Sequence, residues 1–99
     1  MEAVSGVVAR VLRGLGLEDG LRGWRAVEAW PETVGPSLAR RTRAVEYRDG
    51  TLVVEVDGSA WMHEMSLLKR ELMQRLNARL GADVIHDVRL VPPRGGTRR

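Results

Sequence analysis

The first part of the chain carries apolar residues at helical spacing. Six aliphatic side chains lie at positions i, i+3, i+4, i+7, i+8 and i+11, namely Val4, Val7, Val8, Val11, Leu12 and Leu15. This spacing places them on one stripe of an amphipathic helix. Gly16 is expected to end the helix, because glycine readily takes the left-handed conformation that helix ends use.

A second helix is predicted over about residues 21–29, with Trp24 and Val27 on its buried side. The ring of Pro31 disfavours helical backbone at the residue before it, Trp30. We therefore expect the chain to bend at this point or to begin a new turn.

Two alternating runs follow, over residues 45–48 and 52–56. Alternation of apolar and polar residues is typical of β-strands. The dipeptide Asp49-Gly50 lies between the runs and favours a two-residue type I′ turn, which needs positive φ at both positions. The pattern therefore predicts a β-hairpin.

The longest helical pattern begins after Asp57-Gly58-Ser59, a segment expected to end the second strand and to offer an N-cap. Gly81 is expected to be the glycine that ends this helix. Its apolar stripe consists of Trp61, Met65, Leu68, Leu72 and Leu76, flanked by Met62, Met73 and Leu80.

A last strand is predicted over residues 83–91, with Val84, Val88 and Leu90 turned inward. The order of elements is then α-α-β-β-α-β, which predicts an α+β fold with a small three-stranded sheet and a right-handed crossover. Residues 1–91 are expected to form one domain, and residues 92–99 a flexible basic tail.

The two faces of the predicted sheet differ in character. The helices should pack on the face that carries Leu52, Val54 and Val56. The opposite face should be a solvated surface with several ion pairs, made of Glu46, Arg48, Glu55, Asp87 and Arg89.

Composition narrows the range of functions. The chain has no cysteine, which removes disulfides, thiol catalysis and cysteine-based metal sites. The only histidines, His63 and His86, are interpreted as a surface residue and a structural residue, and no group of residues pairs a nucleophile with a base. We therefore expect no enzyme activity, no cofactor and no metal.

The start of the chain lacks a basic stretch followed by an apolar run, so no signal peptide is predicted. No apolar stretch approaches membrane-spanning length. The expected location is the cytoplasm, away from membranes.

Basic residues gather in segments. Residues 37–48 carry four basic groups and one acidic group, whereas residues 49–68 carry four acidic groups and none that is basic. Fifteen of the sixteen basic residues are arginines, which suit phosphate recognition. The candidate nucleic-acid-binding residues are Arg40, Arg41, Arg43, Arg48, Lys69, Arg70, Arg94, Arg98 and Arg99. The alternative interpretation is a mixed, solvated surface.

Two further features are candidate sites. Gly20-Leu-Arg-Gly23 has the GxxG spacing of a nucleic-acid backbone clamp, but a turn between two helices is the favoured interpretation. Leu67 falls off the apolar stripe of the long helix, and its helical neighbours are polar or cationic. A candidate partner-binding surface therefore consists of His63, Leu67, Arg70 and Gln74.

Four segments with distinctive motifs follow one another along the chain: WPETVGPSLA (residues 30–39), GTLVVEV (50–56), SAWMHEM (59–65) and LNARLG (76–81). Thr42 follows the first, and the predicted closing strand over residues 84–90 follows the last. Together they resemble the signature of the DciA family of bacterial replicative-helicase loaders. The resemblance covers about residues 4 to 91.

The resemblance implies a KH-like α+β domain that binds the replicative DNA helicase and single- or double-stranded DNA, helps to load the helicase and has no ATPase activity. Many members carry a longer extension beside this domain, whereas about eight tail residues follow it in this sequence, so the resemblance is not expected to extend to autonomous loading. The alternatives are a KH-like RNA-binding module and a structural homo-oligomeric domain, although a monomer is slightly favoured.

Overall fold

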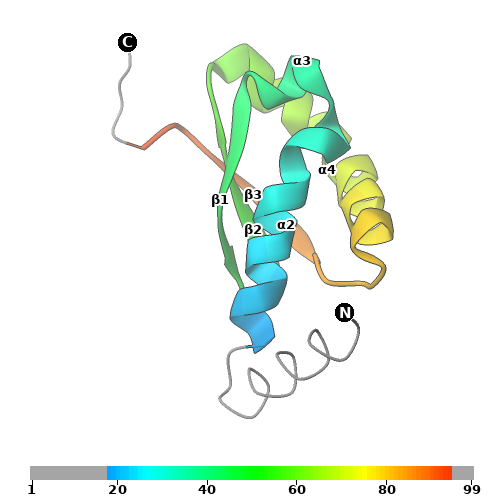
Figure 1. The fold of residues 1–99 in the computed structure, drawn as a ribbon. Helices are drawn as coiled ribbons and strands as arrows, with labels where there is room; N and C mark the ends of the chain where they lie inside the picture. Colours follow the sequence, from blue (N-terminus) through cyan, green and yellow to red (C-terminus); the bar gives the residue numbers. More distant parts are fainter. Residues whose placement is uncertain (1–17, 95–99) are drawn as a thin grey trace.

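The computed structural model describes residues 18–94. The elements are α2 (Glu18–Val34), α3 (Pro36–Ala39), β1 (Thr42–Arg48), β2 (Thr51–Val56), α4 (Ser59–Leu80) and β3 (Asp87–Val91) (Figure 1). The α+β class and the order α-α-β-β-α-β are confirmed. The predicted helix over residues 4–15 lies outside the described residues.

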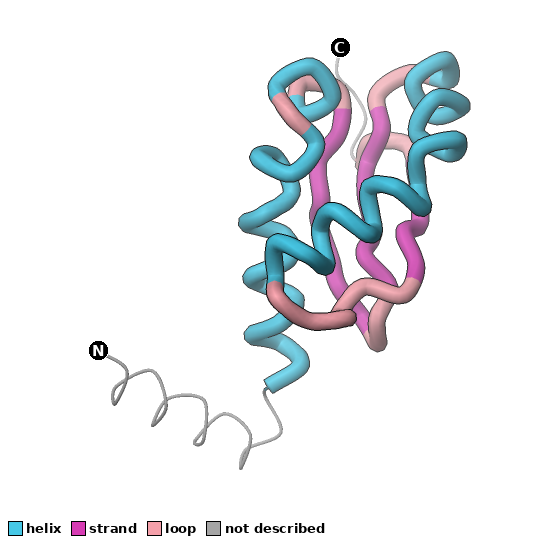
Figure 2. The backbone as a smooth tube through the Cα atoms, turned by 90° about the vertical axis from the view of Figure 1, so that its right-hand side faces the viewer, coloured by secondary structure: helices cyan, strands magenta, loops and turns pink. Residues whose placement is uncertain are grey.

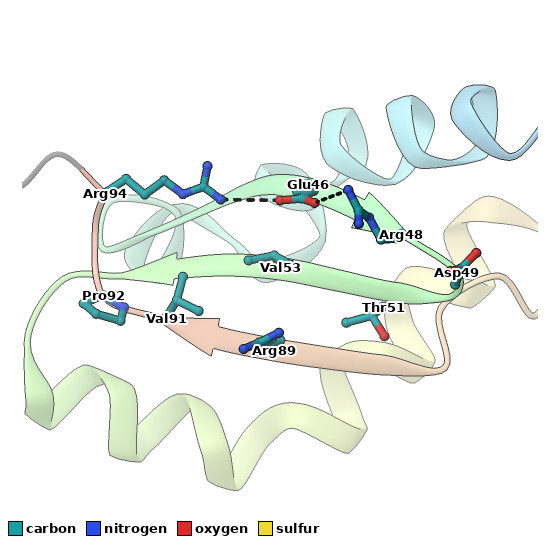
Figure 3. Close-up of a pocket in the computed structure, with 9 residues that line it drawn as sticks. All are labelled: Glu46, Arg48, Asp49, Thr51, Val53, Arg89, Val91, Pro92 and Arg94. Atoms are coloured by element: carbon teal, nitrogen blue, oxygen red, sulfur yellow. Dashed lines mark hydrogen bonds and ion pairs between the residues drawn. The ribbon is translucent and has the colours of Figure 1, made fainter. Parts of the chain in front are cut away.

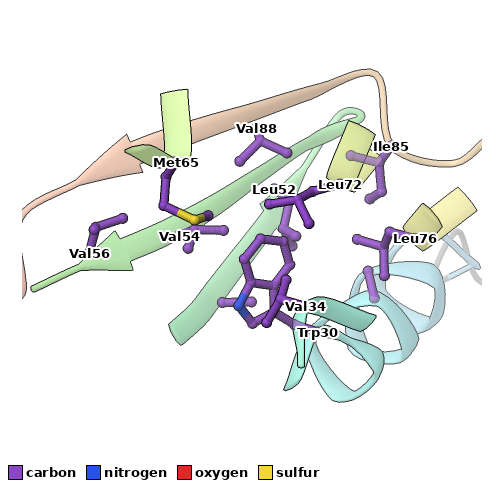
Figure 4. Close-up of a cluster of buried hydrophobic side chains, with 12 residues drawn as sticks. Trp30, Val34, Leu52, Val54, Val56, Met65, Leu72, Leu76, Ile85 and Val88 are labelled. Carbon is purple, nitrogen blue, oxygen red and sulfur yellow. The ribbon is translucent and has the colours of Figure 1, made fainter. Parts of the chain in front are cut away.

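The three strands form one mixed sheet in the order β1-β2-β3. β1 and β2 are antiparallel, whereas β2 and β3 are parallel. Helices α2 and α4 cover the same face of the sheet (Figure 1, Figure 2). Leu52, Val54 and Val56 point toward these helices and are fully buried, as predicted. The core lies between the two layers, where Trp30 and Val34 of α2 meet the strands (Figure 4).

The hairpin confirms the predicted turn, with one irregularity in β1. Asp49 has φ 47° and Gly50 has φ 85°, which are the two positive angles that a type I′ turn needs. In the first half of β1, before this turn, the register with β2 shifts between Ala44 and Glu46. Val45 is therefore an extra residue in the strand, a β-bulge. Simple alternation placed Val45 inward, but Ala44 is the buried residue there.

Helix α2 is longer than predicted and continues through Pro31 to Val34. Its buried stripe consists of Ala26, Trp30 and Val34, which are four residues apart. Burial of a tryptophan is worth more than the local preference against helix before proline, so the helix continues through the proline and no new turn begins there. Trp24 lies off this stripe and is 60% exposed, so its predicted burial was wrong.

Both glycines of the GxxG motif lie inside α2, so the predicted turn between helices was wrong. Gly23 is buried where the helix approaches β1. A Cβ atom there would lie 2.8 Å from both Cβ and Cδ2 of Tyr47. The glycine is therefore needed for close packing of the helix on the sheet. At Gly20, by contrast, an added Cβ would meet nothing within 4 Å.

This difference predicts opposite effects of one substitution at two positions. Gly23→Ala is expected to lower the free energy of unfolding by about 1–3 kcal/mol, because Tyr47 must move. Gly20→Ala is expected to raise it by up to about 1 kcal/mol, because alanine favours a helix. Urea denaturation of both variants, followed by circular dichroism, measures the effects. Equal effects at the two positions would contradict the close approach.

Helix α4 follows the predicted stripe, with Met65, Leu72 and Leu76 buried. Gly81 ends it with φ 77°, as predicted. The N-cap is Gly58, with no side-chain capping bond, whereas Ser59 is already helical. No helix among residues 18–94 combines the length and apolar content needed to cross a membrane.

Strand β3 begins at Asp87, later than predicted, because Asn77 of α4 binds the segment before it. The Asn77 Oδ1 atom accepts hydrogen bonds from the backbone N–H groups of Val84 (3.0 Å) and Ile85 (2.8 Å). Its Nδ2 atom donates to the Ile85 carbonyl at 2.9 Å. These backbone groups therefore bond to the helix instead of the sheet. Ile85 is fully buried, whereas Val84, which was predicted to point inward, is half-buried.

Candidate nucleic-acid and partner surfaces

Three of the predicted arginines meet Arg94 around one groove of about 360 Å³, here called the arginine groove. Arg40 and Arg41 follow α3, and Arg43 is the second residue of β1. Arg94 reaches the groove from the segment after β3. The groove also contains two acidic residues, Glu55 and Asp57. Residues far apart in the sequence thus contribute positive charge to one place.

A second hollow, of about 600 Å³, lies on the sheet face that the helices leave open, here called the open-face hollow (Figure 3). Arg48, Arg89 and Arg94 line it, together with Glu46 and Asp49. Its aliphatic side chains include Val53 and Val91. Arg94 belongs to both hollows, so the arginine groove and the open face adjoin.

Arg89 was not among the predicted nucleic-acid-binding residues. The register places it opposite Val53, whose other neighbour is Glu46 on β1. The alternation of β3 already assigned Arg89 to the open face. Only the parallel pairing with β2 brings it to the same hollow as Arg48 and Arg94.

Two carboxylates lie between the arginines. Glu55 was predicted on a solvated surface, but it is only 8% exposed. Its Oε2 atom accepts a hydrogen bond from the Arg94 backbone N–H at 3.2 Å. Its Oε1 atom lies 3.9 Å from Nε of Arg43. The buried carboxylate is therefore partnered by the backbone N–H of Arg94 and by the guanidinium groups of Arg43 and Arg94.

Glu46 interacts with arginines on both sides (Figure 3). Its Oε1 atom lies 3.4 Å from the Arg94 guanidinium, and its Oε2 atom lies 3.7 Å from that of Arg48. The three side chains are partly or largely exposed. Such ion pairs contribute little to stability, so these guanidinium groups can exchange a carboxylate for another anion at small cost.

The arginines of the groove differ in how firmly they are placed. The Arg41 guanidinium carbon lies 5.7 Å from the centre of the Trp61 ring, which is cation–π geometry. The Arg40 side chain is exposed, and its guanidinium has no partner among residues 18–94. The groove thus presents one guanidinium held by a ring and one that is free to bind.

Lys69 and Arg70 do not join the arginine groove, because α4 lies on the opposite face of the sheet (Figure 2). Lys69 forms an ion pair with Asp87 at 3.8 Å. Arg98 and Arg99 lie outside the described residues. The predicted nucleic-acid set therefore divides, with Arg40, Arg41, Arg43, Arg48 and Arg94 brought together.

The predicted partner surface lies on α4. His63, Leu67, Arg70 and Gln74 are all exposed, and their spacing puts them on one side of the helix. Leu67 is 68% exposed, the largest value among the large apolar side chains of residues 18–94. The four residues form one outward stripe, here called the α4 stripe.

His63 is exposed, as expected. His86 was expected to be a structural residue of the last strand, but it precedes β3 and is exposed, with its Nε2 atom 3.1 Å from the carbonyl oxygen of Asp83. Among residues 18–94, no three histidine or acidic side chains come together as a possible metal site.

The fold and its surfaces define a small α+β domain with helices on one face of a mixed sheet and arginines on and beside the other. The chain belongs to the DciA family, whose model, described as "Dna[CI] antecedent, DciA", matches residues 3–90. The resemblance noted in the sequence is thereby confirmed.

Curated relatives carry the name UPF0232 protein. The one from Corynebacterium glutamicum is 24% identical over 98 residues, which are 99% of this chain and 55% of the relative. The one from Streptomyces avermitilis is 32% identical over 87 residues, 79% of this chain and 48% of the relative. One from Mycobacterium tuberculosis is 28% identical over 79 residues, 73% and 42% of the two chains. The chain thus spans about half the length of the curated relatives it matches.

Proposed function

We propose that this protein is a non-catalytic adapter of DNA replication in the cytoplasm. It binds the replicative DNA helicase and a DNA backbone, and it assists helicase loading. Membership of the DciA family supports the helicase part of the proposal. The observation that carries the DNA part is the meeting of Arg40, Arg41 and Arg43 with Arg94 around one groove.

The chemistry of the two hollows favours phosphate over bases as the group bound. Guanidinium groups bind phosphate oxygens in pairs, and the exposed ion pairs of Arg48 and Arg94 can be exchanged. Neither the arginine groove nor the open-face hollow is lined by an aromatic ring. Stacking on aromatic rings is a common way for RNA-binding sheets to hold bases. The DNA backbone is therefore favoured over the RNA-module alternative.

The α4 stripe is the proposed contact for the helicase. It lies on the helical layer, and none of its four residues lines the arginine groove or the open-face hollow, so one molecule can hold DNA and a protein partner together. Leu67 supplies an exposed apolar centre with polar neighbours, which is the usual composition of a partner site.

The test is capture of the replicative helicase from the same organism on the immobilised full chain, at low and high salt, with and without single-stranded DNA. Specific capture at both salt concentrations is expected. Leu67→Asp is expected to weaken capture roughly tenfold, and Ala78→Asp, at an exposed position on the same helix, is the matched control. Failure of the wild-type chain to capture the helicase would overturn the helicase part of the proposal.

A further inference from the structure

Strand β3 lies at an edge of the sheet. It pairs with β2 along one side, and no strand among residues 18–94 pairs with its other side. An unpaired edge presents a row of backbone N–H and C=O groups that another strand can bind. β3 has five residues, enough for a short ladder.

A furrow of about 600 Å³ runs along this strand, between β3 and α4. Val88 and Leu90, which face the helices, line it, and so does Arg89, which faces the opposite side of the sheet. A hollow that touches both faces of an edge strand must border its free edge, because β2 occupies the other edge. The furrow therefore gives access to the unpaired backbone.

The furrow is both apolar and cationic. Met62 and Leu90 are half-buried and offer apolar surface. Lys69 and Arg89 contribute positive charge, and Asp87 contributes one carboxylate, which pairs with Lys69 at 3.8 Å. The Arg89 guanidinium has no partner among residues 18–94, so the furrow keeps one unpaired cation. The furrow also reaches Ser59 in the first turn of α4, which has no acidic residue to offset the partial positive charge of the helix end. An occupant with carboxylates complements this surface.

The charge of Arg89 disfavours pairing of β3 with the β3 strand of a second copy of the chain, when all five residues of both strands are paired. Antiparallel pairing of two β3 strands about their central residue would place Arg89 opposite Arg89, and like charges directly opposite are destabilising. A register centred on Val88 would avoid this clash but would pair only residues 87–89 and leave Leu90 and Val91 unpaired. The charges thus favour a different chain over a second copy.

We infer that the free edge of β3 accepts an extended, acidic segment of a protein partner as a fourth strand. Backbone hydrogen bonds to β3 hold the segment, Arg89 and Lys69 contact its carboxylates, and Met62 and Leu90 contact its apolar side chains. The inference rests on the proposed function in one respect, namely that the chain binds a protein partner. His63 belongs to both the furrow and the α4 stripe, so the two surfaces adjoin.

The experiment titrates the full chain with a fluorescent peptide in which valine alternates with glutamate. Binding is followed by anisotropy and by hydrogen exchange of the β3 amides. The expected result is saturable binding, with slower exchange at the outward-facing amides of β3. A peptide of alternating valine and lysine is expected not to bind. Binding of both peptides alike, or no slowing in β3, would overturn the inference.

Charge-reversal variants locate the site. Lys69→Glu combined with Arg89→Glu is expected to weaken binding of the acidic peptide roughly threefold to tenfold. Arg75→Glu combined with Arg79→Glu changes the net charge equally, away from the furrow, and is expected to retain binding. All four residues have exposed or partly exposed side chains, so both variants should fold, which circular dichroism verifies. Equal effects of the two variants would overturn the inference.

The outcomes separate this inference from the proposed function. If the helicase is captured but the acidic peptide does not bind, the inferred strand-binding site at β3 is wrong, whereas the proposed adapter function is retained. If the peptide binds β3 but the helicase is not captured, the inferred strand-binding site is retained and the helicase part of the proposed function fails. A dimer in sedimentation that dissociates in the furrow variant would make this edge a contact between copies and would overturn the inference.

Discussion

Replacement of Trp30 by alanine is expected to lower the free energy of unfolding by about 3–5 kcal/mol. Trp30 is 1% exposed and stands at the centre of the stripe by which α2 packs on the sheet. A domain of this length has roughly 5–15 kcal/mol of stability in total, so much of it would be lost. Urea denaturation followed by circular dichroism measures the change without relying on tryptophan fluorescence.

Trp24→Ala is the matched control, because the same residue type in the same helix is 60% exposed there. A loss of about 0.5 kcal/mol or less is expected. Equal losses at the two tryptophans would contradict the orientation of α2.

A second variant isolates the polar part of the Trp30 environment. The indole N–H donates a buried hydrogen bond to Thr42 Oγ1 at 3.0 Å, and that hydroxyl donates to the Leu38 carbonyl at 2.7 Å. Thr42→Val removes the acceptor and leaves the indole N–H without a partner, at an expected cost of about 1–3 kcal/mol. In the double variant with Trp30→Phe, the loss of stability should be smaller than the sum of the two single losses, because no indole N–H remains to be left without a partner.

Removal of Arg40, Arg41 and Arg43 together is expected to produce the largest loss of DNA binding. Each arginine that contacts a phosphate releases counterions, so the slope of log affinity against log salt should fall by about two for single-stranded DNA. At low salt, the affinity should fall on the order of tenfold to a hundredfold. Titration of the triple alanine variant with a labelled oligonucleotide at several salt concentrations measures both quantities.

The matched control removes Arg70, Arg75 and Arg79, three arginines on α4 that do not line the arginine groove. Arg75 and Arg79 form ion pairs with Glu71 and Glu32. Little change in the salt slope is expected. A similar loss in the control would mean that net charge, rather than the groove, binds DNA.

The elements that the sequence predicts well are those whose local signals agree with the tertiary structure. Asp49-Gly50 requires the backbone angles that the hairpin needs, and the stripe of α4 is also the side of the helix that packs. Helix α2 differs, because Trp24 and Val27 were expected on its buried side, whereas Trp24 is exposed and Val27 is only half-buried. The packing of Trp30 against the strands decides which side is buried, and no local window contains that information.

The roles of Gly23 and Asn77 also could not be predicted from the local sequence. Gly20 and Gly23 look alike in the sequence, yet only Gly23 lies against Tyr47. Asn77 belongs to the LNARLG motif, and the structure shows its role, since its side chain bonds to three backbone groups before β3. These roles depend on what a distant segment places beside the residue.

The candidate site was partly predictable for the same reason. Arg40, Arg41 and Arg43 lie within four consecutive residues, so the sequence alone already places them near one another. Arg94 and Arg89 join the arginine surfaces only through the parallel pairing of β3. Lys69 and Arg70 were grouped with them by charge alone, but their helix lies in the other layer.

The parallel pairing of β2 with β3 also affects folding during synthesis. The hairpin of residues 42–56 contains only local contacts and can form early in a nascent chain. The central strand β2 gains its second neighbour only after the whole of α4 and residues 87–91 have been translated. Until β3 has emerged from the ribosome, β2 exposes an unpaired edge, and the apolar surface that Ile85 and Val88 cover in the folded protein stays open to water.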